Sequence, residues 1–431
     1  MFETTFSRNL LCLCLVSVLL HSALAASPSP PGAVKTVTMA RAVEWSLSRN
    51  PRIEAGAAAV EAAIARTRQA GFLPNPEIEG EVEDIPLSSE AHGLDGSVYA
   101  VRAAVPIELG GKRARRRHAA SLETDLSRWD LDAERLDLAA EVKARFIDLL
   151  TAQERVRMLT ASHELGRKVR DTAAERVQSG KVSPLELTKA EVELTGQRIE
   201  LRRAERSLAT ARIALAALWN AAPAEAATLH ADENLRQAPQ LPDLPTLEAA
   251  LSKNPDLARW EAEEQVARAI VAQERAARIP DVTLSAGITH ERKSGGDFAQ
   301  FAISLPLPLF DRNQGNIAAA LAEVRKARLA RRAAEISLRA ELAGQWQELQ
   351  ATVEEAKAIE DEVLPGARKA FEAAQQAYRS GKLPYLEVLD AQQTLFDAEI
   401  QGLEALSALR QTTVLVERLV GGSLEKTPRR K

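Results

Sequence analysis

Cysteine is almost absent from this chain of 431 residues, which contains only two. Both, Cys12 and Cys14, lie in an apolar run that ends in Ala-Leu-Ala at 23–25. This pattern is typical of a secretory signal peptide, which we place at 1–25. Because 26–431 then contains no cysteine, we expect neither a disulfide nor a thiolate metal site in the exported chain.

Aromatic residues, excess charge and long apolar runs are also scarce. Aromatic residues make up 4% of the chain, and 56 Lys+Arg nearly balance 60 Asp+Glu. A nucleic-acid binder needs a basic face or stacking aromatics, so we expect no nucleic-acid partner. Beyond the signal peptide no apolar run reaches the roughly 18 residues of a spanning helix, so any membrane-spanning part is expected to be a β-barrel.

Motifs for catalysis and metal binding are missing as well. The histidines after the signal peptide are scattered singly: His92, His118, His163, His230 and His290. Without cysteine or a histidine pair, we expect no metal site and no cofactor in one chain. The Gly-Gly-Lys-Arg string at 110–113 lacks the first glycine and the Ser or Thr of a phosphate loop. We therefore expect no enzymatic activity.

The chain does contain a long internal repeat. Leu-Ser-Arg-Asn-Pro at 47–51 recurs as Leu-Ser-Lys-Asn-Pro at 251–255, and Ser-Gly-Lys at 179–181 recurs at 380–382. Both spacings are about 200 residues and keep the same order, which chance matches between helical sequences would not do. We infer two copies of one structural unit.

This repeat fixes the expected domain boundaries. They are a signal peptide at 1–25, a first repeat at 26–237, a Pro-rich linker at 238–245, a second repeat at 246–420 and a polar tail at 421–431.

Each repeat changes its hydrophobic period along the chain. A helical pattern comes first, at 39–71 and 246–279, and ends at prolines. Alternation of period two follows, which predicts β-hairpins at 77–105 and 281–305. Four strands cannot bury a core alone, and alternating apolar and polar faces are typical of outer-membrane barrels. The alternative is the edge of a soluble sandwich. Because about eight strands are needed to close a barrel, several chains would have to contribute.

A very long helix is predicted after each hairpin, at 112–177 and 316–378, and each reverses at Ser-Gly-Lys into a return helix. The two predicted helical hairpins thus cover 112–219 and 316–420. A heptad series predicts a coiled-coil seam along the first long helix. Its positions are Leu122, Leu126, Trp129, Ala133, Leu136, Ala140, Ile147 and Leu150. The predicted fold class is mainly α with a small β part.

The order helix, β-hairpin, long helix, tip turn and return helix, present twice over about 36–420, resembles the outer-membrane efflux factors of the TolC family. Three strings are similar to the heavy-metal branch of CzcC-like and CusC-like proteins: Pro-Ile-Glu-Leu-Gly-Gly-Lys-Arg at 106–113, Pro-Leu-Pro-Leu-Phe-Asp-Arg-Asn-Gln-Gly-Asn at 306–316, and Tyr-Leu-Glu-Val-Leu-Asp-Ala at 385–391.

This resemblance implies a homotrimer with a twelve-stranded transmembrane barrel in outer-membrane lipid and an α-barrel in the periplasm of a Gram-negative cell. The implied partners are a periplasmic adaptor (membrane fusion) protein and an inner-membrane pump of the resistance-nodulation-division class. The chain would be a passive exit duct for divalent heavy-metal cations, of the cobalt, zinc and cadmium type or the copper and silver type.

The turns at the hairpin tips are candidate contacts for the adaptor and the pump. Their residues are Gly180, Lys181 and Pro184 in the first repeat, and Gly381, Lys382 and Pro384 in the second. Exposed loops that recur in both halves suit docking. The alternative is that they only reverse the helices.

Acidic residues beside the tips and in the first hairpin are candidate cation contacts. Glu387 and Asp390 resemble the acidic ring at the periplasmic mouth of TolC, and Glu186 occupies the equivalent position of the first repeat. The alternative is ordinary solvated helix charge. A row of four acids is expected to face the barrel lumen, with a polar but unselective lumen as the alternative: Glu77, Glu79, Glu81 and Glu83.

Two other functions remain open at this point. A duct of the same fold could export drugs or, by type I secretion, proteins. A periplasmic adaptor is the alternative from another class, although adaptors usually carry one helical hairpin rather than two. Sensitivity of a deletion strain to metals, but not to dyes or detergents, would distinguish a duct for metals from a duct for drugs.

Overall fold

The computed structural model describes residues 35–85, 96–235, 242–252, 254–422 and 424. The predicted signal peptide lies outside these residues, as do half of the Pro-rich linker and most of the polar tail. Within the described ranges, no helix has both the length and the apolar character needed to cross a membrane.

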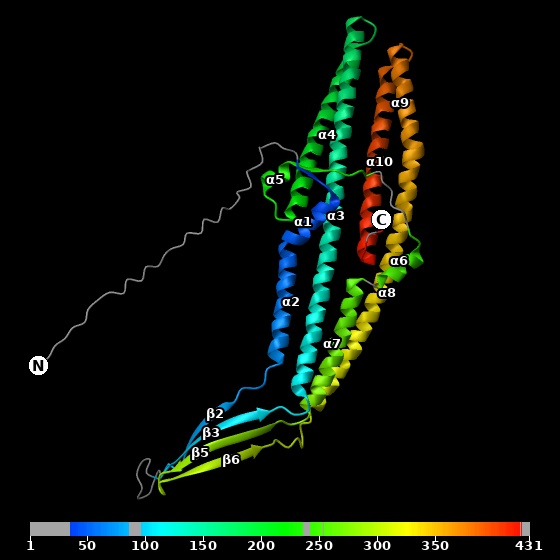
Figure 1. The fold of residues 1–431 in the computed structure, drawn as a ribbon. Helices are drawn as coiled ribbons and strands as arrows, with labels where there is room; N and C mark the ends of the chain where they lie inside the picture. The colour runs from blue at the N-terminus through cyan, green and yellow to red at the C-terminus, as the bar shows by residue number, and fades with distance from the viewer. Residues whose placement is uncertain (1–34, 86–95, 236–241, 253, 423, 425–431) are drawn as a thin grey trace, which may run out of the picture. The chain divides into compact units, whose positions relative to one another are not determined.

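The chain is mainly helical with a small β part, as predicted (Figure 1). The first half contains β1 (Lys35–Val37), α1 (Met39–Arg49), α2 (Pro51–Ala70), β2 (Glu77–Glu83), β3 (Val98–Ile107), α3 (Lys112–Gln178), α4 (Pro184–Ala217), α5 (Pro223–Ala227) and β4 (Leu229–Ala231). The second half contains α6 (Leu244–Leu251), α7 (Pro255–Ala277), β5 (Val282–Glu291), β6 (Gly296–Ser304), α8 (Gln314–Ala358), the π-helical turn η1 (Ile359–Val363), α9 (Leu364–Arg379) and α10 (Tyr385–Val420).

The first helix of each repeat is broken in two, where the sequence predicted one continuous helix. In the first half the break falls at Asn50, whose extended backbone separates α1 from α2. Its side chain accepts a hydrogen bond from the Arg52 amide at 2.9 Å and donates to the Leu218 carbonyl oxygen at 2.8 Å. Proline favours this break because the residue before it avoids helical backbone.

The same arrangement occurs in the second half. Asn254 accepts from the Asp256 amide at 2.7 Å and donates to the Leu419 carbonyl oxygen at 2.5 Å. The repeated Leu-Ser-Arg/Lys-Asn-Pro string is thus a structural motif. It caps one helix and holds the C-terminal end of the return helix beside it.

The two repeats are also joined by ion pairs. The Arg418 guanidinium of α10 contacts Asp137 of α3 at 2.5 Å and Asp256 of α7 at 2.7 Å. Lys143 of α3 contacts Glu417 at 2.6 Å. Burial alone would lower the pKa of Arg418, but the hydrogen bonds to the two aspartates outweigh it and raise that pKa. Arg418 therefore stays charged.

The heptad seam predicted on α3 is only partly correct. Ile147 and Leu150 are buried, but Trp129 is 37% exposed. Fully buried side chains also lie off the predicted series, at Leu138 and Val142, each two positions from Ala140. The physical reason is that α3 packs against α2, α4, α7 and α10 rather than against one partner, so its buried face changes along its length.

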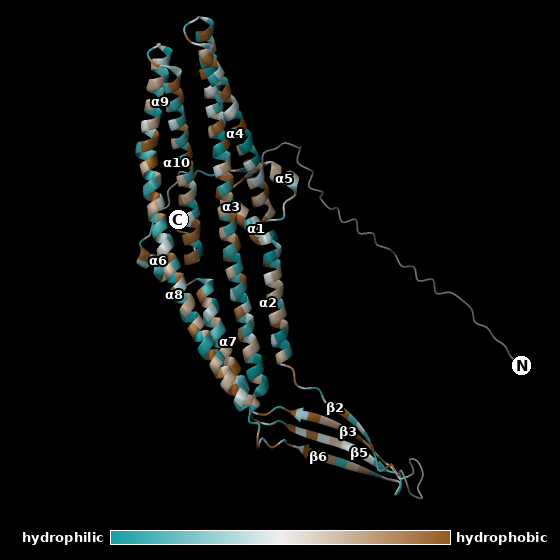
Figure 2. Cartoon of the chain, turned by 180° about the vertical axis from the view of Figure 1, so that it is seen from behind, coloured by the Kyte–Doolittle hydropathy of each residue, from teal (hydrophilic) through white to brown (hydrophobic). Residues whose placement is uncertain are grey.

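Strands β2, β3, β5 and β6 form one antiparallel sheet in that order. The register places Glu79 opposite Arg102, and Arg102 opposite Gly287. Cross-strand partners point to the same face, so the sheet has one polar face and one apolar face. Figure 2 shows the mixed hydropathy along these strands. A second sheet, the parallel pair β1–β4, was not predicted, because strands of three residues carry no readable period.

Candidate functional site

The two tip turns have the same backbone structure. Gly180 and Gly381 have φ angles of 68° and 76°, a left-handed conformation that favours glycine. The amide of Lys181 donates to the Arg176 carbonyl oxygen, and the amide of Lys382 donates to that of Ala377, both at 2.9 Å. Each turn therefore closes its helix with a glycine C-cap and leaves its lysine exposed.

The candidate mouth acids begin the return helices. Glu186 and Glu387 are each the third residue of their helix, α4 and α10. An acid in the first turn interacts favourably with the helix dipole, which gives both a structural role in addition to any functional one. Glu387 and Asp390 are exposed, whereas Glu186 is half-buried.

The structure brings Glu186 close to Tyr378 and Tyr385, which flank the second tip turn and were not predicted as site residues. Arg176 donates to the Tyr378 carbonyl oxygen at 2.9 Å, and its guanidinium lies 4.4 Å from the centroid of the Tyr378 ring. Tyr378 is 6.0 Å from the ring of Tyr385. Burial, with further contributions from Glu193, Tyr378 and Glu186, raises the pKa of Tyr385 to about 12. These groups join the two hairpins next to the tips.

The amino-acid composition already contains an indication of this contact between the hairpins. The chain has three tyrosines, and two of them flank the second tip turn. A rare aromatic type concentrated at one turn indicates a packed site rather than a solvated loop.

The four acids of β2 lie on the polar face of the sheet. Arg102 of β3 forms an ion pair with Glu81 and lies 3.8 Å from Glu79. Two of the four carboxylates are therefore partly neutralised by one arginine. The role of this arginine could not be predicted, because the pairing register of the strands cannot be read from alternation alone.

The opposite face of the sheet is apolar and exposed. Phe301 is 84% exposed, Ile78 82% and Ile303 75%. On the polar face, by contrast, Ala100 and Ala104 are buried. A large exposed apolar face marks a surface that contacts protein or lipid.

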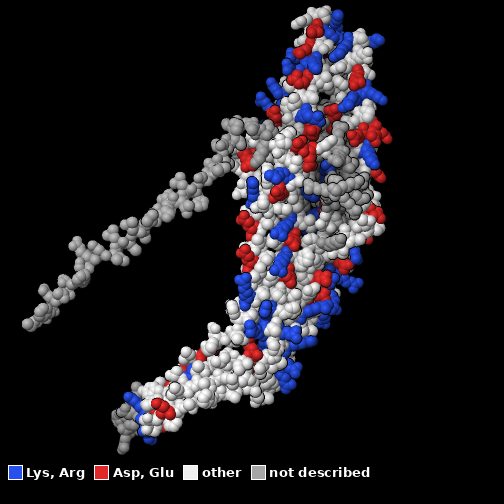
Figure 3. All heavy atoms as spheres, in the orientation of Figure 1, with Lys and Arg blue, Asp and Glu red and all other residues white. Residues whose placement is uncertain are grey.

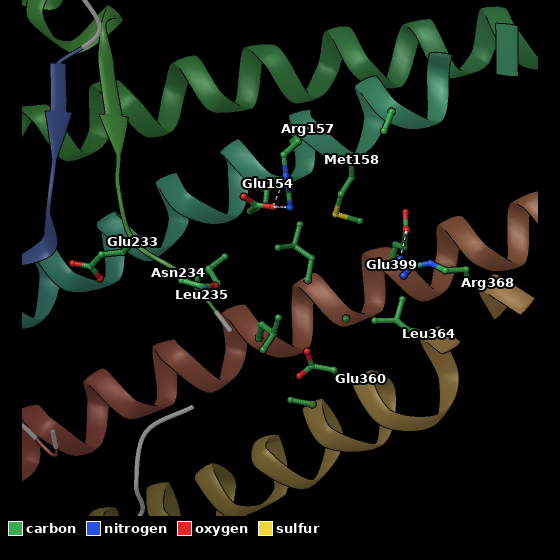
Figure 4. A pocket seen from close by; sticks show the side chains of 15 residues that line it. Glu154, Arg157, Met158, Glu233, Asn234, Leu235, Glu360, Leu364, Arg368 and Glu399 are labelled. Carbon is green, nitrogen blue, oxygen red and sulfur yellow. Dashed lines mark hydrogen bonds and ion pairs between the residues drawn. The ribbon is translucent and has the colours of Figure 1, made fainter. Parts of the chain in front are cut away.

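A cavity of about 710 Å³ lies between α3 and the second helical hairpin (Figure 4). Met158, Leu364 and Leu403 form apolar parts of its wall. At its rim Glu154 forms an ion pair with Arg157, as does Glu399 with Arg368. Glu233 and Glu360 also line the cavity, but among the described residues no group of three acids or histidines is placed to hold a metal ion.

Comparisons with known proteins show which family has this architecture. The family model described as outer membrane efflux protein matches the chain twice, at 43–221 and 246–422. The chain is 36% identical over 393 residues to the cobalt-zinc-cadmium resistance protein CzcC of Cupriavidus metallidurans, covering 91% of this chain and 92% of the relative. It is 27% identical over 410 residues to the pyoverdine export outer membrane protein OpmQ of Pseudomonas putida, covering 90% of this chain and 87% of the relative.

A solved structure of CusC has the same fold. The TM-score is 0.76 at 19% sequence identity, covering 89% of this chain and 92% of that chain. Together with the two family matches, this identifies the helical hairpins and the four-stranded sheet as those of an outer-membrane channel that extends into the periplasm. The chain belongs to the outer membrane efflux protein family.

Proposed function

We propose that this protein is the outer-membrane exit duct of a tripartite efflux system that discharges divalent heavy-metal cations. The observation that carries the proposal is the 36% identity to a cobalt-zinc-cadmium resistance protein over 91% of the chain. The chain would perform no chemistry, and the energy would come from an inner-membrane pump of the resistance-nodulation-division class.

The working form would be a homotrimer. Among the described strands, β2 pairs only with β3 and β6 pairs only with β5, so each has an outer edge available to another chain. Three copies would contribute twelve strands to a closed barrel, with the apolar face toward lipid and the Glu77–Glu83 row toward the lumen. The exposed apolar face supports this arrangement.

The tip turns would dock the periplasmic adaptor or the pump. Two turns with the same backbone geometry, each with an exposed lysine, would offer similar contacts in both repeats. Glu387 and Asp390 of three copies would lie around the mouth and attract cations. Glu186 would take less part, because it is half-buried beside Tyr378.

Deletion of the gene tests which class of substrate the duct exports. We expect the deletion strain to become sensitive to zinc, cobalt, cadmium or copper salts, and the full-length gene on a plasmid to restore growth. Sensitivity to dyes and detergents should not change. A strain sensitive to dyes or detergents but not to metals would contradict the proposal.

An organic substrate is the second candidate, and the 27% identity to a pyoverdine export protein over 90% of the chain favours it. Under this alternative the deletion strain would retain an organic compound in the periplasm and keep its metal resistance. The same strain therefore distinguishes the two candidates.

A further inference from the structure

All four connections between the sheet and the helices leave from the same end of the strands. Because the strands are antiparallel in the order β2-β3-β5-β6, the starts of β2 and β5 lie beside the ends of β3 and β6. Helix α2 leads into β2 and α7 into β5, whereas α3 follows β3 and α8 follows β6. We call this row of strand ends the helix-side edge.

Each of these connections carries an exposed large apolar side chain. Following the order of the strands, Phe72 is 61% exposed, Leu109 38%, Ile279 43% and Phe310 91%. We call these residues and their exposed apolar neighbours the junction band. The neighbours are Leu73, Leu305, Leu307 and Leu309. The band runs along the whole helix-side edge.

Exposed arginines lie just on the helix side of this band. Arg68 is in the last turns of α2, Arg115 and Arg117 are in the first turns of α3, Arg278 follows α7 and Arg312 precedes α8. Figure 3 shows blue side chains gathered over the helices beside the sheet, while the sheet itself is mostly white in this view.

Two of the carboxylates at this level are already paired with a base, whereas Asp311 only accepts a hydrogen bond from the Asn313 amide. Glu108 forms an ion pair with Arg116 at 2.6 Å, and Asp281 with Lys112 at 2.8 Å. Over the described ranges, Arg115, Arg117 and Arg278 make no ion pair with a carboxylate. The arginines beside the junction band therefore carry an unbalanced positive charge.

We propose that the junction band and these arginines bind anionic phospholipids of the periplasmic leaflet of the outer membrane. Apolar side chains at the sheet edge would enter the acyl region, and guanidinium groups one helical turn away would contact lipid phosphates. Juxtamembrane basic groups attract anionic lipid surfaces in this way. The proposal depends on the outer-membrane location and not on the identity of the exported substrate.

A second copy of the chain is the other possible occupant. A second copy would bring the same arginines to the contact, and like charges repel. Phosphate groups instead complement the charge, and Leu305 of the band continues the alternation that places Phe301 and Ile303 on the apolar face of the sheet. Charge complementarity thus favours lipid.

The first test measures lipid selectivity. The full-length chain, purified in detergent, is reconstituted into phosphatidylcholine vesicles with spin-labelled phosphatidylglycerol or spin-labelled phosphatidylcholine. Electron paramagnetic resonance then reports the lipid immobilised on the protein. We expect a preference of about fivefold for phosphatidylglycerol. The variant Arg115→Gln/Arg117→Gln/Arg278→Gln should fall below about twofold.

A matched triple variant controls for the loss of charge as such. Arg198→Gln/Arg202→Gln/Arg206→Gln removes three exposed arginines from the middle of α4 and should keep the preference. An unchanged preference in the first triple variant, or an equal loss in both, would overturn the proposal.

The second test locates Phe310 and does not depend on the arginine variants. The described chain has no cysteine, so Phe310→Cys in a chain whose signal peptide has been removed gives a single spin-label site. We expect the label to collide with oxygen, which dissolves in lipid, more often than with a water-soluble nickel chelate. A label shielded from both reagents would overturn the proposal and assign the band to contact between copies.

Discussion

Asn50 and Asn254 each fasten the end of one helix to the start of another. Their side-chain oxygen caps the helix that follows, and their side-chain nitrogen binds a carbonyl oxygen at the C-terminal end of the return helix. Both groups are buried, so neither hydrogen bond can be replaced by water without rearrangement.

Replacing Asn254 by Ala should destabilise the chain. The variant loses a helix cap and leaves the Leu419 carbonyl oxygen without its donor, at a cost of about 1–3 kcal/mol. Thermal unfolding of the detergent-solubilised protein should show a lower midpoint. Ser252→Ala, at an exposed position of the same segment, is the control. Equal midpoints for the two variants would contradict the assigned role.

Glu264 is a buried acid between α7 and α8. It contacts Arg268 at 2.5 Å, and Arg328 and Arg331 at 3.5 Å. The hydrogen bond from Arg268 is the largest cause of its lowered pKa, and burial opposes it. The carboxylate is therefore held ionised between two helices.

Glu264→Gln should destabilise the chain in a pH-dependent way. Because the folded-state pKa lies below the ordinary value of 4.5, the ionised acid stabilises the fold fully above pH 4.5 and loses this contribution as pH falls through the folded-state pKa. We expect a loss of about 1–2 kcal/mol at pH 7. Unfolding midpoints of wild type and variant should converge on acidification below pH 4.5, and a gap that stayed constant would rule out the ionised form as the cause.

At the scale of elements, the strands and the long helices could be predicted because their periods extend over many residues. The β2 strand alternates over Glu77–Glu83, and α3 runs without proline over Lys112–Gln178. The shortest elements, β1 and β4, could not be predicted because three residues show no period. Prolines mark the interruptions: Pro51 keeps Asn50 out of helical backbone, and the π-helical turn directly precedes Pro365, which lacks an amide hydrogen.

The candidate site was predictable to a smaller extent. The tip glycines could be predicted because a helix reversal needs left-handed backbone. Arg102 and the contact between Arg176 and Tyr378 depend on which segments meet in space, across many residues of sequence. Local patterns do not contain that information.

Gly381→Ala should disturb the second tip turn. At φ 76° a Cβ atom costs about 1 kcal/mol, although no neighbouring atom lies within 4 Å of it. Gly381→Asn should be tolerated better, since asparagine adopts left-handed backbone more readily. The readout is the unfolding midpoint together with metal resistance of the complemented strain. An alanine variant as stable as the asparagine variant would show that the turn does not require glycine.

At the scale of the whole molecule, we propose that the acids beside the tips act only as a set. In one chain Glu387 and Asp390 are exposed and three residues apart on α10. Three copies around an axis would bring six carboxylates together, a concentration of charge that attracts cations. The proposed ring is therefore a property of the assembly.

The double variant Glu387→Ala/Asp390→Ala should weaken the cation preference of the channel in planar lipid bilayers. Block by multivalent cations added on the periplasmic side should weaken as well, because the attracting charge is gone. Glu205→Ala/Glu248→Ala removes two exposed acids far along the chain from the tips and is the control. Unchanged selectivity and block would remove the assigned role from both acids.

The exposed apolar face of the sheet also has a consequence for biogenesis. Between export and insertion, a single chain would present Phe301, Ile78 and Ile303 to water. Such a surface, beside unpaired strand edges, promotes aggregation. We therefore expect newly exported chains to require an escorting chaperone until they reach their destination, and cells short of such chaperones to lose this protein to proteolysis.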